Sequence, residues 1–138
     1  MRRFQWTAAH LYVRHTLMAD TSWYIPFQKK EDELRPKVQG AIDFVLKSTQ
    51  GETPKIQSHL FYGAIGIDPK HLVIWYLFNT DSDKCLSETS GHMNKIAAMT
   101  MQALKDRNYP YHSVDIDRIC FASEEEIQRA GGHRAFFQ

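Results

Sequence analysis

A run of seven consecutive apolar or aromatic residues, 72–78, dominates the hydrophobic pattern of the chain, and polar turn residues flank it on both sides. Its length and its β-branched and aromatic content are typical of a strand that is covered on both faces. A membrane span needs about 20 such residues. We therefore predict a central strand over 72–78, with Trp75 and Phe78 almost fully buried.

Two segments have the periodicity of amphipathic helices. Residues 31–47 carry apolar side chains at helical spacing, with acidic residues expected near the N-terminal end and Pro36 in the first turn. The second helix is predicted over residues 87–107, where Asn108 and Pro110 end it. The two predicted buried stripes are Leu34, Val38, Ala41, Ile42 and Val45, and Met93, Ile96, Ala97, Thr100, Met101 and Leu104.

Further strands are predicted on both sides of these elements. Residues 57–67 and the central strand are expected to form an antiparallel hairpin across the turn 68–70. Pairing of Ile67 with His71 would place His59 opposite Asn79. Residues 114–121 alternate as a strand whose phase changes around Arg118, which indicates a bulge.

The two ends of the chain carry weaker patterns. Residues 4–18 favour a helix whose face includes Trp6 and Val13, although part of the segment also alternates as a strand would. Residues 23–27 are expected to be extended, because Pro26 disfavours helical geometry at Ile25. Ser123 and Glu126 form a capping-box pair that opens a short helix, Gly131-Gly132 closes it, and residues 133–138 are predicted to add an edge strand.

These elements predict one α+β domain over 1–138, with a mainly antiparallel sheet packed by two amphipathic helices. A net charge of +1 on 138 residues excludes the strongly basic character of a nucleic-acid-binding protein. The middle of the chain is acidic, with six Lys/Arg against ten Asp/Glu over residues 68–126. Two cysteines without paired spacing, and the absence of a signal-peptide pattern, predict a cytoplasmic protein.

Motifs for catalysis or metal binding are weak. The seven histidines show no spacing typical of a zinc site, and residues 79–90 lack the glycine and glutamate that a calcium loop requires. No cofactor or metal is therefore expected. A small hydrolase that uses His59 with Asp81 and Asp83, or with Cys85, remains the alternative to a binding protein.

The C-terminal part resembles the ending of small bacterial immunity proteins that neutralise polymorphic or contact-dependent-inhibition toxins. The resemblance comprises a strand ending at 119–121, the capping box that begins at Ser123, the glycine pair and a terminal aromatic strand. It implies a cytoplasmic, non-enzymatic protein that binds one cognate toxin domain. An acidic middle suits that role, because opposite charge accelerates association with a basic partner.

The leading hypothesis is thus a non-catalytic binding protein with an acidic face. The expected partner-binding residues are carboxylates, with two tyrosines in a loop as further anchors: Asp81, Asp83, Glu88, Asp115, Asp117, Tyr109 and Tyr111. Asp115 and Asp117 share one exposed face of a predicted strand. If that strand neighbours the central one, these two are expected to form one acidic patch with Asp81 and Asp83. Self-pairing through the terminal strand is a third interpretation, and the sequence leaves the oligomeric state open.

Overall fold

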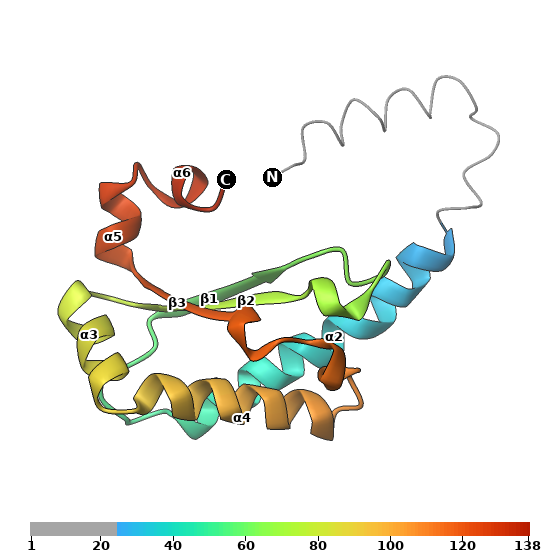
Figure 1. The fold of residues 1–138 in the computed structure, drawn as a ribbon, viewed down its shortest axis with the longest axis horizontal. Coiled ribbons are helices and arrows are strands. Elements are labelled where there is room, and N and C mark those ends of the chain that lie inside the picture. The colour runs from blue at the N-terminus through green and yellow to red at the C-terminus, as the bar shows by residue number, and fades with distance from the viewer. Residues whose placement is uncertain (1–24) are drawn as a thin grey trace.

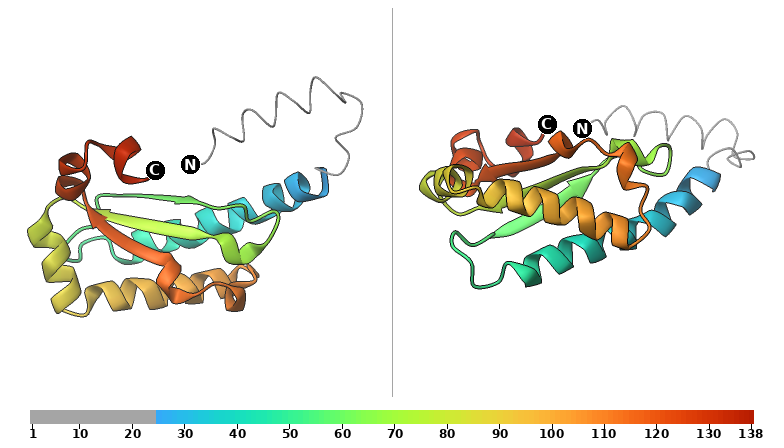
Figure 2. Two further views of the ribbon diagram at one scale, coloured as in Figure 1. Left: turned by 45° about the horizontal axis from the view of Figure 1, so that its top comes forward. Right: turned by 60° about the horizontal axis from the view of Figure 1, so that its bottom comes forward.

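The computed structural model describes residues 25–138, in which two long helices cover one face of a sheet (Figure 1). Within this part of the chain, β1 (Ser58–Tyr62) pairs antiparallel with β2 (Val73–Phe78), and β3 (Ile119–Ser123) pairs parallel with the other edge of β2. The helices α2 (Ile25–Ser48) and α4 (His92–Asp106) lie side by side beneath the sheet (Figure 2). The α+β class is confirmed, but the sheet is mixed, because the helical connection from β2 returns the chain in parallel.

The inner face of the sheet, which faces α2 and α4, carries the main core. Ile74, Tyr76 and Phe78 of the central strand are all fully buried there. Phe121 of β3 stacks on both aromatic rings, with centroid distances of 5.9 Å to Tyr76 and 6.2 Å to Phe78. The Tyr76 hydroxyl lies 2.7 Å from Thr100 Oγ1 of α4, so the one polar group of this strand that enters the core has a partner.

The outer face of the sheet is only partly covered, which corrects the prediction for Trp75. Leu77 is fully buried beneath Ile127, whereas Trp75 retains partial exposure beneath Phe136 and Phe137. The run 72–78 therefore does alternate between a sealed face and a half-open one, and its apolar outer positions obscured this in the sequence. The outer face comprises Leu60, Tyr62, Val73, Trp75, Leu77, Cys120 and Ala122.

The buried stripe of α2 is the one predicted, but the helix is longer than residues 31–47. It begins at Ile25, so residues 25–27 are helical rather than extended, Pro36 lies inside the helix, and the acidic residues 31–33 lie beyond the first turn. The added residues 25–30 are exposed, and the apolar residues 25–27 are followed by polar ones, so no helical apolar periodicity marked this segment. Side-chain pairs one helical turn apart, such as Gln28 with Asp32 at 2.9 Å, stabilise them instead.

The helix predicted over 87–107 is two helices. α3 (Asp81–Thr89) and α4 meet at Gly91, whose φ of 83° is a left-handed conformation that breaks the helix. Within α4 the predicted stripe is confirmed, with Ile96, Ala97, Thr100 and Leu104 buried and Met93 and Met101 partly buried.

The β1–β2 hairpin is confirmed as antiparallel, but its register was wrong. His59 pairs with Tyr76 rather than with Asn79. The connection is longer than a tight turn, because residues 63–72 include a 3₁₀ turn at Pro69–His71. A second turn, in which the Ala64 carbonyl accepts from the backbone N–H groups of Ile67 and Asp68, takes residues 63–67 out of the predicted ladder.

Two other strand predictions were also wrong. Residues 116–118 form a 3₁₀ turn before β3, which explains the change of phase near Arg118 without a bulge. The C-terminal residues form a helical turn, α6 (His133–Phe136), after the short helix α5 (Glu124–Arg129), so the self-pairing edge strand expected there is absent. The prediction for residues 4–18 lies outside the described residues.

Candidate functional site at the α3–α5 end of the sheet

Two helices begin at the same end of the sheet. Phe78 of β2 is paired with Ser123 of β3, and because the two strands are parallel, the helices that follow them start side by side. Thr80 caps α3 by accepting a hydrogen bond from the Asp83 backbone N–H at 3.1 Å. Ser123 opens α5 with the predicted capping box, in which its hydroxyl and the Glu126 carboxylate satisfy each other's backbone N–H groups.

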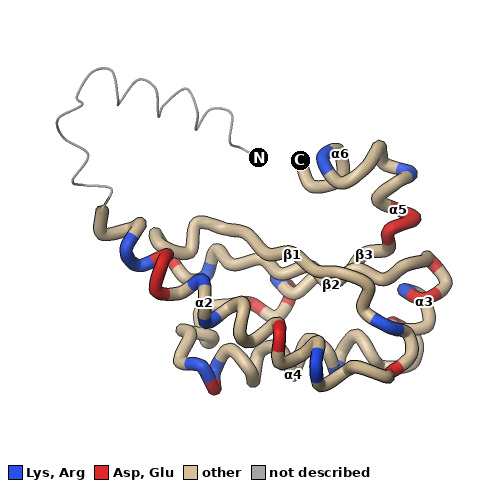
Figure 3. Tube along the Cα trace, turned by 180° about the vertical axis from the view of Figure 1, so that it is seen from behind, with Lys and Arg blue, Asp and Glu red and all other residues tan. Residues whose placement is uncertain are grey.

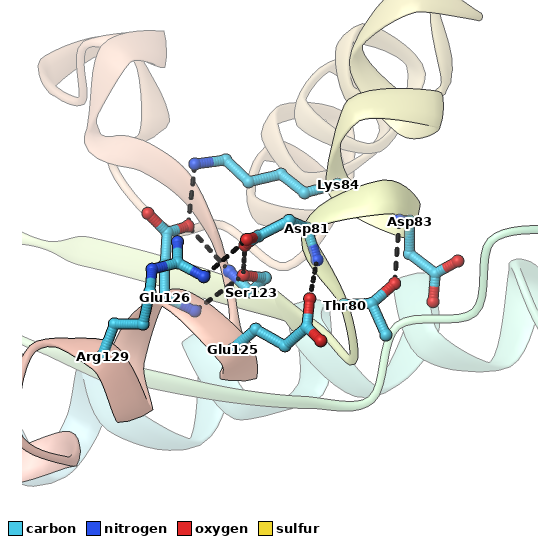
Figure 4. A network of polar contacts seen from close by, with 8 residues as sticks. All are labelled: Thr80, Asp81, Asp83, Lys84, Ser123, Glu125, Glu126 and Arg129. Carbon is cyan, nitrogen blue, oxygen red and sulfur yellow. Dashed lines mark hydrogen bonds and ion pairs between the residues drawn. The ribbon is translucent and has the colours of Figure 1, made fainter.

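Polar contacts connect the two helix starts, and we call this arrangement the joint (Figure 4). The Ser123 hydroxyl donates to Asp81 Oδ1 at 2.5 Å, and Arg129 Nη1 donates to Asp81 Oδ2 at 2.6 Å. In return, the Asp81 backbone N–H donates to Glu125 Oε1 at 2.8 Å. Each helix therefore caps or neutralises the other, which orders the side chains before any partner arrives.

The electrostatics of Asp81 follow from these contacts. The hydrogen bond from Arg129, followed by that from Ser123, lowers the pKa of the Asp81 carboxyl below its usual value, although partial desolvation opposes the shift. Asp81 is thus held as an anion inside the joint. Its role is therefore structural, because both of its carboxylate oxygens are already engaged by Ser123 and Arg129.

The other carboxylates at this end divide into those with a basic partner and those without one. Lys84 pairs with Glu126 at 2.8 Å and His133 lies 2.9 Å from Glu124, but Asp83, Glu88 and Glu125 form no ion pair within residues 25–138. The acidic segments of α3 and α5 gather at one end of the molecule (Figure 3). We call this surface the acidic end; it comprises Asp81, Asp83, Glu88, Glu124, Glu125 and Glu126.

One apolar side chain is exposed within the acidic end. Leu86 lies between Asp83 and Glu88 on α3 and is 46% exposed. Cys85 beside it is also exposed. On the helix, Leu86 lies one turn after Asp83, so an exposed apolar side chain stands beside an acidic one.

The four predicted aspartates do not form one patch. Asp115 and Asp117 are both exposed, but they precede β3, whose first residue pairs with Ile74 at the start of β2. Asp81 and Asp83 follow the end of β2, so the two pairs are separated by roughly 13 Å of strand, at about 3.3 Å per residue. The error came from the assumed antiparallel sheet.

The tyrosine loop is folded back on the core. Tyr109 is only 2% exposed, and its hydroxyl donates to the Pro69 carbonyl at 2.8 Å, so it is unavailable to a partner. Burial raises the pKa of Tyr109, and the nearby Asp68 adds to the shift. Tyr111 is half-buried with Lys105 over its ring, so the loop offers no exposed aromatic anchor.

The residues of the hydrolase alternative do not lie together in the fold. His59 shares the inner face with Tyr76, and its Nε2 lies 3.4 Å from Gln39 of α2, not beside Asp81 or Asp83. Within residues 25–138, no group of three or more histidine, cysteine or acidic side chains is placed to bind a metal ion. No helix in that range is both long and apolar enough to cross a membrane.

The structure also contains a line of Ser, His and Glu side chains that the sequence did not predict. Ser87 Oγ lies 3.0 Å from His92 Nδ1, and His92 Nε2 lies 3.1 Å from Glu52 Oε1, in a Ser–His–Glu line. The prediction of one continuous helix over 87–107 concealed it, because only the break at Gly91 brings these groups together. Ser87 is fully buried, so no substrate reaches its hydroxyl, and the line fastens the α3–α4 corner to the loop after α2.

Comparisons with known proteins give no family for this chain. No protein-family model matches it, and no curated protein or solved structure matches it significantly.

Proposed function

We propose that this is a non-catalytic binding protein that holds a basic protein partner against its acidic end. The observation that carries the proposal is a set of three carboxylates at one end of the sheet that form no ion pair within residues 25–138, together with the exposed Leu86: Asp83, Glu88 and Glu125. Cationic side chains of a partner would supply the missing charges, and an apolar partner side chain would cover the leucine.

The polar contacts of the joint favour binding over a merely solvated surface. Ordering a side chain on association costs roughly 0.5–1.5 kcal/mol, and a backbone already fixed by capping contacts avoids further ordering costs. Like-signed charge at one end also steers an oppositely charged partner during diffusion and raises its association rate. The acidic end is therefore suited to fast capture of a basic surface.

The specific form that we propose is an immunity protein that covers a basic toxin domain. Three of the features in the C-terminal resemblance have counterparts in the fold: a strand, here Ile119–Ser123, the capping box at its end, and the turn at the glycine pair. The fourth, a terminal strand, is a helical turn instead. The acidic end includes the capping-box segment itself, which connects the resemblance to the proposed binding surface.

The test is co-purification of a partner from the native host in mild salt, with the partner identified by mass. The triple variant Asp83→Asn/Glu88→Gln/Glu125→Gln keeps side-chain shape and removes three charges. A matched control, Asp106→Asn/Asp115→Asn/Asp117→Asn, removes three exposed charges away from the acidic end. We expect the control to retain the partner and the triple variant to lose it; equal retention by both variants contradicts the proposal.

A further inference from the structure

The outer face of the sheet becomes progressively less covered from one end to the other. Leu77 and Ala122 are fully buried beneath α5, and Trp75 is half-covered by Phe136 and Phe137 at centroid distances of 5.8 and 5.2 Å. Farther along, Tyr62 is 43% exposed, and it receives a hydrogen bond of 3.0 Å from the Trp75 indole nitrogen. An apolar, aromatic surface is thus left open at the Tyr62 end.

The described chain begins at this same open end. A Cβ on Gly66, in the connection that follows Tyr62, would collide with the Phe27 carbonyl oxygen, so the first turn of α2 packs directly on the connection. Two further apolar side chains, Ile25 and Ile67, are exposed at this end, by 59% and 64%. The first turn of α2 projects past the β1–β2 connection (Figure 1). Residues 1–24 therefore join the described chain at the same end of the sheet as the uncovered part of the outer face.

The composition of residues 1–24 suits an apolar surface. Thirteen of these 24 residues are hydrophobic, including Trp6 and Val13, and only Asp20 is acidic. If residues 4–18 adopt the helix that their pattern favours, its length is about 22 Å at 1.5 Å per residue. A six-residue strand such as β2 spans a comparable roughly 20 Å.

We propose that the open part of the outer face is the docking surface for residues 1–24 of the same chain. A tethered segment competes at an effective concentration of about millimolar, which favours it over a second copy or a separate partner. Docking would give the sheet a second cover and leave the acidic end, at the far end of β2, free for the proposed partner. The inference does not depend on that function.

Cys120 is a natural reporter of this surface, because it lies on the outer face opposite Trp75 and is partly exposed. The other cysteine, Cys85, is removed with Cys85→Ser. The reaction rate of Cys120 with a soluble thiol reagent is then measured in the otherwise full chain, in a chain lacking residues 2–24, and in the variant Trp6→Asp/Val13→Asp. Ala8→Asp/His15→Asp is the matched control, since these residues fall on the opposite face of the predicted helix.

We expect Cys120 to react at least about tenfold faster in the deletion and in Trp6→Asp/Val13→Asp, while the matched control stays near the full-chain rate. If the deletion variant does not fold, the comparison between Trp6→Asp/Val13→Asp and its matched control tests whether residues 1–24 cover Cys120. Rates that agree within twofold in all chains overturn the inference. Protection that depends on protein concentration, with a dimer mass by light scattering, also overturns it, because a second copy is then the occupant.

Discussion

At the scale of single residues, the structure separates carboxylates that hold the fold from those that are free to bind. Asp81 is engaged by Ser123 and Arg129, whereas Asp83 two residues later has only its backbone N–H engaged, by Thr80. The sequence shows two similar aspartates after a strand and gives no means of ranking them. Their difference arises from a residue 48 positions away, Arg129.

Asp81 should link stability to pH. Its pKa is lowered in the folded state by Arg129 and Ser123, so its contribution to stability is present above the unfolded value of about 3.9 and is lost as pH falls through the lower, folded value. We expect the free energy of unfolding, measured with urea, to decline from about pH 4 downwards and to decline less in Asp81→Asn. An equally steep decline in Asp81→Asn and in the charge-matched control Asp106→Asn contradicts this assignment.

The buried Tyr76–Thr100 pair should show unequal losses. Thr100 Oγ1 donates to the Ile96 carbonyl at 2.8 Å, so it accepts from the Tyr76 hydroxyl. Thr100→Val leaves that hydroxyl buried without an acceptor and should cost about 1–3 kcal/mol, whereas Tyr76→Phe should cost about 1 kcal/mol. Chemical denaturation of the two single variants and the double variant measures this; a larger loss in Tyr76→Phe would show that the donor direction is reversed.

At the scale of elements, apolar periodicity predicted the strand and the helix faces that form the core, but not how the elements are connected. It identified the central strand and the buried stripes of α2 and α4, because those side chains must avoid water. It failed where local backbone conformation decides. The turn that follows Gly63 shifted the hairpin register, and Gly91 divided one predicted helix into two. The parallel pairing of β3 had no local signal, since it depends on how the α3–α4 connection packs.

The break at Gly91 should depend on backbone conformation alone. A Cβ at this position would have no atom within 4 Å, so the cost of Gly91→Ala is the strain of a left-handed φ, roughly 1–2 kcal/mol. Gly91→Asn should be less destabilising, because asparagine tolerates this region. Urea unfolding of both variants is the measurement, and an alanine variant as stable as the parent protein would contradict the strained corner.

At the scale of the whole molecule, the two ends of the sheet differ in surface chemistry: one is acidic and the other is apolar. One end gathers two capped helix starts, six acidic residues and an exposed leucine, and the other gathers exposed apolar residues beside the entry of residues 1–24. Only some of the candidate acidic residues could be placed together from the sequence. Asp83 and Glu88 follow the central strand in sequence, but Glu125 joins them only because β2 and β3 are parallel.

The most direct test of the acidic-end account is the association rate of the captured partner, measured by stopped flow at several ionic strengths. We expect the rate for the parent protein to fall steeply as salt rises, and Asp83→Asn/Glu88→Gln/Glu125→Gln to associate more slowly with a flatter salt dependence. The control Asp106→Asn/Asp115→Asn/Asp117→Asn should keep most of the parent's rate and slope. An association rate that ignores both salt and the triple substitution contradicts the account.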